Sequence, residues 1–262
     1  MRRRLPATGL FRAGALSMAL LLAACGSHRP LADADDAMAT LDSGRLRLQL
    51  SATAGAEQPT GPVGFRMEGP FSTAKGELPL LDLRYTRLLG GDEVMTRIVS
   101  TGDAVYLVAD GKVSEVPVQK TAQLRLGDGD GGIADLGIAG WIKDAVVEER
   151  DDGTKTVSGE LDVADFLSDL ARVGEQVGGG GGGKELDSAA AGRLQRLARS
   201  SELTVELGAD DLPRSLKAVV DFGDSVPEEL RQTLGQYASV RLELTLALER
   251  LTEPLVVKRP LN

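Results

Sequence analysis

The chain is poor in the side chains that most thiol-dependent, metal-dependent and histidine-dependent sites require. Its 262 residues include one cysteine, Cys25, and one histidine, His28, and only 3% of the residues are aromatic. A single cysteine excludes a disulfide within the chain and a metal site built from several thiolates. A single histidine close to the N-terminus, with no neighbouring ligand, does not suit a zinc site or a Ser–His–Asp triad.

Positive charge is also scarce. Lys and Arg together number 30 against 39 Asp and Glu, which gives a formal net charge of −9. An acidic chain of this kind repels the phosphates of nucleic acids and of anionic lipid headgroups. We therefore expect no nucleic acid partner, and no general attraction to an anionic surface.

The apolar run near the N-terminus is short. It extends from Ala13 to Ala24 without a charge and follows Arg2, Arg3, Arg4 and Arg12. A membrane-spanning helix needs about 20 predominantly apolar residues, which this run does not reach. A positively charged start, a short apolar middle and small residues at the end are typical of a secretory signal peptide.

The four residues Leu22-Ala23-Ala24-Cys25 resemble the lipobox of bacterial lipoproteins. The resemblance implies that the Cys25 thiol receives a diacylglyceryl group and that Cys25 becomes the first residue of the mature chain. We therefore expect a lipoprotein signal peptide over 1–24, the acylated cysteine and a tether over 25–30, and one globular domain over 31–262. Loss of the four arginines before Cys25 would lower the formal net charge to −13. The expected location is the outer face of a bacterial plasma membrane, held by two acyl chains.

After the tether, the apolar residues follow first a helical period and then mainly a period of two. Helices are expected over 31–41, 138–143, 166–177 and 186–197, with a further short helix that starts at Ser225. Strands are expected over 46–50, 63–67, 81–85, 94–100, 105–109, 112–116, 123–126, 145–149, 155–161, 203–207, 216–222 and 242–248, with a final edge strand over 254–260.

These elements predict an α+β fold. Many strands joined by tight turns favour one largely antiparallel sheet with one apolar face. Such a sheet must cover that face or close upon itself, and the helices are few. A curved, mostly antiparallel sheet with a few helices packed on its concave face fits best. The six glycines at 178–183 join two of the helices, either as a plain flexible connector or as a hinge for a lid.

Two short motifs match known sites but lack the rest of those sites. The loop over 127–132 contains G-x-G-x-x-G, yet its two aspartates would repel a pyrophosphate. A calcium loop that began at Asp128 would need glycine and glutamate at the places of Ile133 and Ala139. The segment Ser72-Thr73-Ala74-Lys75 matches S-x-x-K, but the partner motifs S-D-N and K-T-G are missing. We therefore expect no catalytic residue, no metal site and no cofactor, and a protein that is not an enzyme.

Several segments in a fixed order point to a family. They are the helix-then-strand opening, Gly102–Tyr106, Thr156–Asp162 before a helix, and the ending Val256–Pro260. Together they resemble the LppX/LprG-type lipoproteins of actinobacteria, which belong to the wider LolA/LolB-like set of bacterial lipid carriers. The resemblance covers most of residues 31–260 and implies a LolA-like half-barrel around an apolar cavity. It also implies that the protein binds or shuttles acylated lipids or glycolipids, with an envelope transporter as a further partner.

The apolar strand faces provide the candidate residues for the wall of that cavity. They are Leu46, Leu48, Leu50, Val63, Phe65, Met67, Leu81, Leu83, Leu242, Leu244 and Leu246, with Phe166, Leu170 and Leu194 from the helices. An apolar wall offsets about 0.8 kcal/mol per methylene, or about 12 kcal/mol for one long acyl chain, without any catalytic group. The same alternation also suits a solid core. The alternative is therefore an envelope lipoprotein with a filled core that acts as a protein-interaction or structural module.

Overall fold

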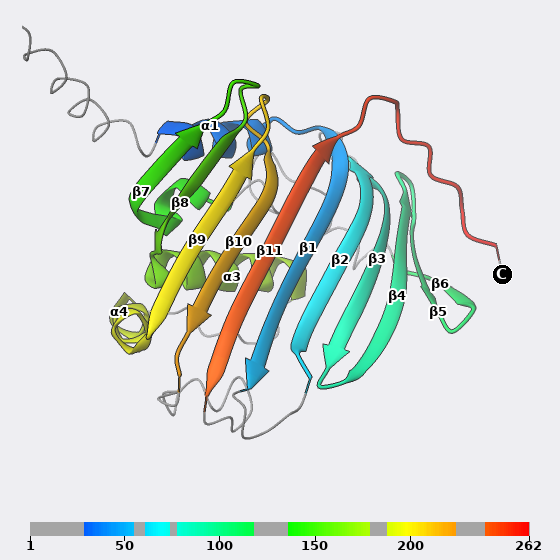
Figure 1. Cartoon of the computed structure of the whole chain (residues 1–262). Helices are drawn as coiled ribbons and strands as arrows, with labels where there is room; N and C mark the ends of the chain where they lie inside the picture. Colours follow the sequence, from blue (N-terminus) through cyan, green and yellow to red (C-terminus); the bar gives the residue numbers. More distant parts are fainter. Residues whose placement is uncertain are drawn as a thin grey trace, which may run out of the picture.

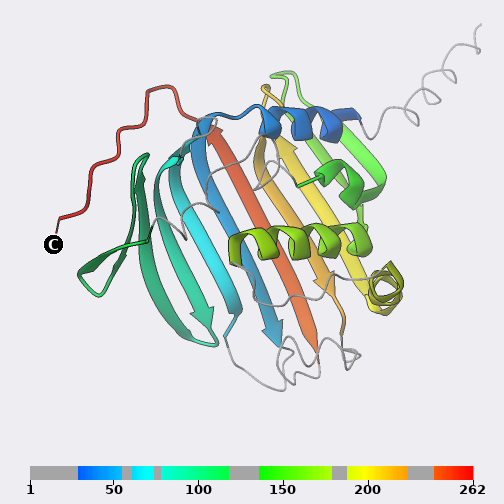
Figure 2. The ribbon, with the colours of Figure 1, turned by 180° about the vertical axis from the view of Figure 1, so that it is seen from behind.

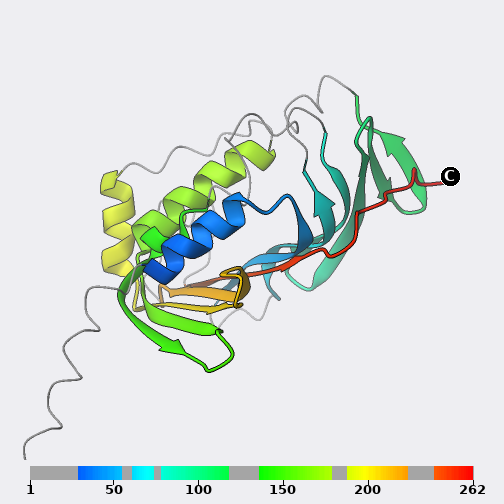
Figure 3. The same ribbon diagram turned by 90° about the horizontal axis from the view of Figure 1, so that it is seen from above.

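A computed structural model describes residues 29–54, 61–73, 78–117, 136–178, 188–223 and 239–261. Within this part of the chain, eleven strands form one sheet in the order β6-β5-β4-β3-β2-β1-β11-β10-β9-β8-β7. Every neighbouring pair is antiparallel. The sheet is open between its two edge strands and strongly curved, and the helices lie on its concave face (Figures 1 and 3). The predicted α+β class and curved antiparallel sheet are confirmed.

The strands alternate as the period of two predicts. They are β1 (Ser43–Ala54), β2 (Val63–Ser72), β3 (Leu80–Leu89), β4 (Asp92–Thr101), β5 (Val105–Ala109), β6 (Lys112–Glu115), β7 (Ile142–Glu149), β8 (Lys155–Leu161), β9 (Ser200–Leu207), β10 (Pro213–Asp221) and β11 (Val240–Arg250). On β11, four leucines from Leu242 to Leu248 are buried on the concave face, and the residues between them are more exposed. Because paired residues of an antiparallel sheet point to the same side, the pairing register assigns every strand residue to one face.

The helical elements of the described chain are α1 (Arg29–Ala39), the short 3₁₀ helix η3 (Ile138–Trp141), α3 (Val163–Gly178) and α4 (Ser188–Leu197). They lie over β1 and β7–β11 (Figures 2 and 3). The core between them and the sheet includes Leu31, Trp141, Phe166, Leu216 and Leu244, all of which are nearly inaccessible to solvent. Full burial of one such side chain stabilises the fold by about 1.5–3 kcal/mol. Most of the hydrophobic stabilisation of the fold therefore comes from the strands that the helices cover.

Two sequence-based expectations are wrong. The tail over 254–260 is not an edge strand, because Pro254 and Pro260 have no N–H to donate to a ladder. The tail instead contacts the sheet through Arg259, whose guanidinium lies 5.1 Å from the centre of the Tyr106 ring. The helix expected over 138–143 ends at Trp141, and the next residue, Ile142, already belongs to β7.

Some expected elements lie outside the described residues. These are the strand over 123–126, the loop over 127–132, the helix that starts at Ser225 and the glycines over 179–183. The first glycine of the expected connector, Gly178, is the last residue of α3.

Candidate functional site

The concave face of the sheet has two parts that differ in what covers them. The helices of the described chain lie over β1 and β7–β11, and none of them lies over β3–β6 (Figure 2). We call these parts the covered half and the uncovered half of the concave face. The wall residues predicted from the sequence are divided between them.

In the covered half, seven of the predicted wall residues are buried in one core cluster. They are Leu46, Leu48, Leu242, Leu244 and Leu246 from the strands, with Phe166 and Leu194 from the helices. Each contacts other side chains of the chain itself, so a ligand could reach them only by displacing packed side chains. Their contact with a ligand stays a prediction.

The other predicted wall residues lie at or beyond the edge of the helical cover. Leu50, Val63, Phe65, Met67, Leu81 and Leu170 are only partly buried, and Leu83 is buried outside the core cluster. The Phe65 ring stacks on the ring of Tyr85 on the next strand, with 6.0 Å between the ring centres. The uncovered half thus presents an apolar surface that begins where the helices end.

Three exposed apolar residues of this surface were not among the predicted wall residues. Val94 is 52% exposed and Leu107 is 39% exposed, and Leu89 is exposed to a similar degree. The pairing places them on the concave face, because Arg87 pairs with both Phe65 and Val94, and Ile98 pairs with both Leu83 and Leu107. The alternation of each strand was visible in the sequence, but the register that assigns these residues to this face was not.

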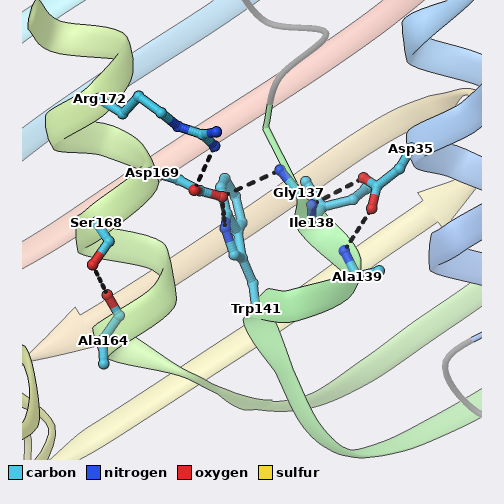
Figure 4. Close-up of polar contacts among 9 residues, drawn as sticks. All are labelled: Asp35, Gly137, Ile138, Ala139, Trp141, Ala164, Ser168, Asp169 and Arg172. Atoms are coloured by element: carbon cyan, nitrogen blue, oxygen red, sulfur yellow. Dashed lines mark hydrogen bonds and ion pairs between the residues drawn. The ribbon is translucent and has the colours of Figure 1, made fainter. Parts of the chain in front are cut away.

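Polar contacts hold the helical cover together around η3, between α1 and α3 (Figure 4). The Asp35 carboxylate accepts hydrogen bonds from the backbone N–H groups of Ile138 and Ala139 at 2.9 and 3.1 Å. On the other side, one carboxylate oxygen of Asp169 accepts hydrogen bonds from Trp141 Nε1 at 2.8 Å and from the Gly137 N–H at 3.2 Å. We call this arrangement the Asp35–Asp169 clamp.

Burial shifts the pKa of the Asp35 carboxyl group in the clamp. It raises the pKa of Asp35 to about 6, even though the two backbone N–H groups work in the opposite direction, and the charges of Asp169 and Asp36 add to the rise. Burial also raises the pKa of Asp165 on α3. The indole of Trp141 packs edge-on against the Phe166 ring, with 5.1 Å between the ring centres. Packed aromatic rings and the half-buried carboxylates of Asp35 and Asp169 therefore surround η3.

A second set of contacts fixes the start of α3. Asp162 caps this helix by accepting hydrogen bonds from the N–H groups of Ala164 and Asp165, and its carboxylate pairs with Lys143 at 2.7 Å. Although burial works to raise it, the pKa of Asp162 is lowered by Lys143 and by these N–H groups. The Val163 N–H donates to Gln195 Oε1 at 2.7 Å, which connects α3 to α4.

Neither the clamp nor the helix cap resembles a metal or catalytic centre. No group of three metal-ligating side chains occurs among the described residues. Within the same residues, no helix is both long and apolar enough to cross a membrane. Cys25 and His28 lie outside the described part of the chain.

Comparison with known proteins identifies the fold. No protein-family model matches the sequence, and no curated protein is similar to it. The structure is similar to the crystal structure of LprF from Mycobacterium bovis, with a TM-score of 0.50 and 14% identity over 90% of this chain and 97% of that one. Mycobacterium tuberculosis lipoprotein LppX aligns with a TM-score of 0.40 and 11% identity over 89% and 98% of the two chains. The likeness to LprF confirms the fold that the LppX/LprG-type resemblance implied.

Proposed function

We propose, from the fold shared with LprF, that this chain is an exported, lipid-anchored protein that binds the acyl chains of a lipid or glycolipid on the uncovered half of its concave face. Two acyl chains on Cys25 would hold it at the outer face of the plasma membrane, where one chain would bind only marginally. Shuttling of the bound lipid, and handover to or from an envelope transporter, belong to the same proposal.

The observation that carries the proposal is the exposure of apolar side chains on the uncovered half. Val94 and Leu107 expose a large part of their surface to water on the same face as the Phe65–Tyr85 stack. The exposed Arg87 lies between Phe65 and Val94 on this face, so one charged side chain interrupts the apolar surface. Exposed apolar side chains gathered on one face of a protein mark an interaction site. A long acyl chain that lay against it would recover part of the about 0.8 kcal/mol per methylene that exposure to water costs.

The helical cover gives this surface a fixed boundary. Leu50 on β1 and Leu170 on α3 pack against the core cluster while keeping part of their surface free. The Asp35–Asp169 clamp holds α1, η3 and α3 together. A lipid on the uncovered half would therefore meet a rigid edge of packed helices rather than a flexible loop.

Two exposed valines on opposite faces of the sheet provide a matched test. Val94 faces the concave side, and Val146 on β7, 58% exposed, faces the outer side because its neighbour Val147 pairs with the core residue Val157, so Val94→Glu and Val146→Glu add the same charge on opposite faces. Organic extraction and mass spectrometry of protein purified from its native source should yield about one equivalent of lipid from the wild type. Val94→Glu should lose that lipid, and Val146→Glu should keep it.

The rival function rests on the packing of the covered half. There the predicted wall residues form a core of the chain's own side chains, as expected of an envelope lipoprotein that acts as an interaction or structural module. Absence of stoichiometric lipid from repeated native preparations of the wild type would favour this rival. Equal lipid loss in the two glutamate variants would also count against an acyl site on the concave face.

A further inference from the structure

The outer face of the sheet, opposite the helices, contains a hollow over β1–β4. Its volume is about 580 Å³, which falls within the range of about 300–1,000 Å³ typical of small-molecule sites. The charged residues that line it are Arg45, Arg47, Glu68, Asp82, Arg84 and Arg97. No residue of this hollow belongs to the exposed apolar surface of the concave face.

The backbone of β2 leaves room for the hollow. Pro70 pairs with Arg45 and so lies on the outer face, where its compact ring replaces a longer side chain. The preceding Gly69 has a φ of +148°, and a Cβ there would lie 2.2 Å from the carbonyl oxygen of Asp82. Only glycine therefore allows β2 to approach β3 so closely at this point.

Positive charge exceeds negative charge in the hollow. Arg97 makes two hydrogen bonds to Asp82, at 2.6 and 2.7 Å, and Arg84 pairs with Glu68 at 2.8 Å. Arg84 and Arg97 lie directly opposite each other on paired strands, an arrangement of like charges that costs free energy.

The other two arginines of the hollow, Arg45 and Arg47 on β1, have no ion pair or hydrogen bond of their side chains within the described residues. The lining has four guanidinium groups against two carboxylates, in a chain whose formal net charge is −9. One further carboxylate, Glu249, is opposite Arg45 on β11 but outside the lining. The hollow is thus a local exception to the charge of the whole chain.

We propose that this hollow binds a phosphate-bearing group, with Arg45 and Arg47 as its principal ligands. A guanidinium presents two parallel N–H donors that match two oxygens of a phosphate. The acidity of the rest of the chain does not prevent this, because charges farther away than the Debye length of about 8–10 Å are largely screened.

Two sources can supply such a phosphate, a lipid headgroup and a soluble compound, and the proposed anchor at Cys25 favours the headgroup because it keeps the domain at a membrane surface. The hollow lies over β1–β4 on the outer face, whereas α1, which starts at Arg29 four residues after Cys25, lies on the concave face with its start near β7 and β8 (Figures 1 and 3). The headgroup assignment therefore rests on the proposed anchor at Cys25, whereas the phosphate site itself does not. It also does not depend on the acyl site.

The first experiment titrates sn-glycerol 3-phosphate into the full acylated chain in nanodiscs of digalactosyldiacylglycerol, a lipid without phosphate, by calorimetry in phosphate-free buffer. The wild type should bind one equivalent, and R45Q/R47Q should bind at least tenfold more weakly. The control R193Q/R241Q removes two exposed arginines away from the hollow and should bind like the wild type. Lack of wild-type binding, or an equal loss in the control, would overturn the proposal.

Two further variants keep the test decisive if R45Q/R47Q unfolds. M95E introduces a carboxylate into the hollow at an exposed residue and should abolish binding, whereas V146E, on the same outer face but away from the hollow, should not. R45K/R47K keeps the charge without the paired donors, so its affinity should fall between those of the wild type and M95E. Wild-type affinity in M95E would contradict the assignment to this hollow.

A second experiment distinguishes the two sources of phosphate. The same titration is repeated in nanodiscs that contain phosphatidylglycerol, with 300 mM salt in both cases to screen the charge of the disc surface. If the hollow holds lipid headgroups, phosphatidylglycerol should compete and lower the apparent affinity for glycerol 3-phosphate several-fold. Equal affinities in the two discs would overturn the headgroup assignment and leave a site for a soluble phosphate compound.

Discussion

The Asp35 carboxylate on α1 accepts a hydrogen bond at 3.1 Å from the backbone N–H of Ala139, which lies 104 residues later in the chain. This contact and its partner at Ile138 attach the first helix of the described chain to η3. The apolar residues Leu31, Ala34 and Met38 bury one side of α1 in the core, and the half-buried Asp35 adds the hydrogen bonds to η3.

The stability of the fold should therefore depend on pH through Asp35. Its pKa is about 6 in the folded chain against an ordinary value of 3.8, so the folded state binds a proton more readily than the unfolded state. The stabilisation that protonated Asp35 provides is complete below about pH 4 and is lost as the pH rises through about 6. Denaturant titrations across this range should show the loss in the wild type but not in Asp35→Asn.

The matched control for that titration is Asp42→Asn, which removes an exposed carboxylate just beyond α1. Its free energy of unfolding should follow the wild-type pH dependence. Parallel curves for the wild type and Asp35→Asn between pH 4 and 7 would show that Asp35 does not titrate in this window.

The hydrogen bond from Trp141 to Asp169 should contribute measurably to stability. Trp141→Phe keeps an aromatic ring against Phe166 but removes the Nε1–H donor to a largely buried carboxylate. We expect a loss of about 1–3 kcal/mol in the free energy of unfolding, because hydrogen bonds to charged groups are worth about that much. Urea denaturation followed by circular dichroism measures it, since the variant has no tryptophan fluorescence. A double-mutant cycle with Asp169→Asn should give a coupling energy clearly different from zero.

The two halves of the concave face should respond differently to truncation. Leu244→Ala removes a side chain that is 1% exposed at the centre of the core and should cost about 2–5 kcal/mol. Leu107→Ala, in the uncovered half, should change the stability of lipid-free protein by less than about 1 kcal/mol. Similar losses at both positions in denaturant titrations would show that the uncovered half is packed as tightly as the covered half.

The cap of α3 should also be separable from its ion pair. Asp162→Ala removes both the cap and the ion pair with Lys143. Loss of the cap alone should lower the free energy of unfolding by about 0.5–2 kcal/mol. Asp162→Asn keeps an oxygen that can cap the helix but loses the charge that faces Lys143, so its loss should be smaller. Because the pKa of Asp162 is lowered in the folded chain, the stabilisation that its charge provides should be lost as the pH falls below about 4.

Local patterns in the sequence were sufficient to predict most of the strands, because each has a regular apolar face. Leu46 and Phe65 follow the same alternation, yet one is buried under the helices and the other lies at the edge of the cover. Local periodicity cannot distinguish such positions, since their burial depends on which helix lies above them. The family resemblance predicted an apolar cavity on the concave face, but not which half of the sheet the helices cover.

Contacts between distant segments were beyond sequence-based prediction. Asp35 looked like an ordinary acidic residue of a helix, and its role depends on η3, far along the chain. In the same way, Arg45 and Arg47 looked like the solvated face of a strand. Only the pairing of β1 with β2, of β2 with β3 and of β3 with β4 brings them near Arg84 and Arg97.

The sheet order places the first and last strands of the described chain next to each other at its centre. β1 pairs with β11 along their whole length, from Gly44 opposite Arg250 to Ala54 opposite Val240. The strands β1–β6 and β7–β11 can each form from neighbouring segments of the chain, but the central seam, the pairing of β1 with β11, needs residues from both ends of the described chain. Loops that close over such distances slow folding. A ribosome or a translocation channel must therefore release the chain through Arg250 before the central seam can close.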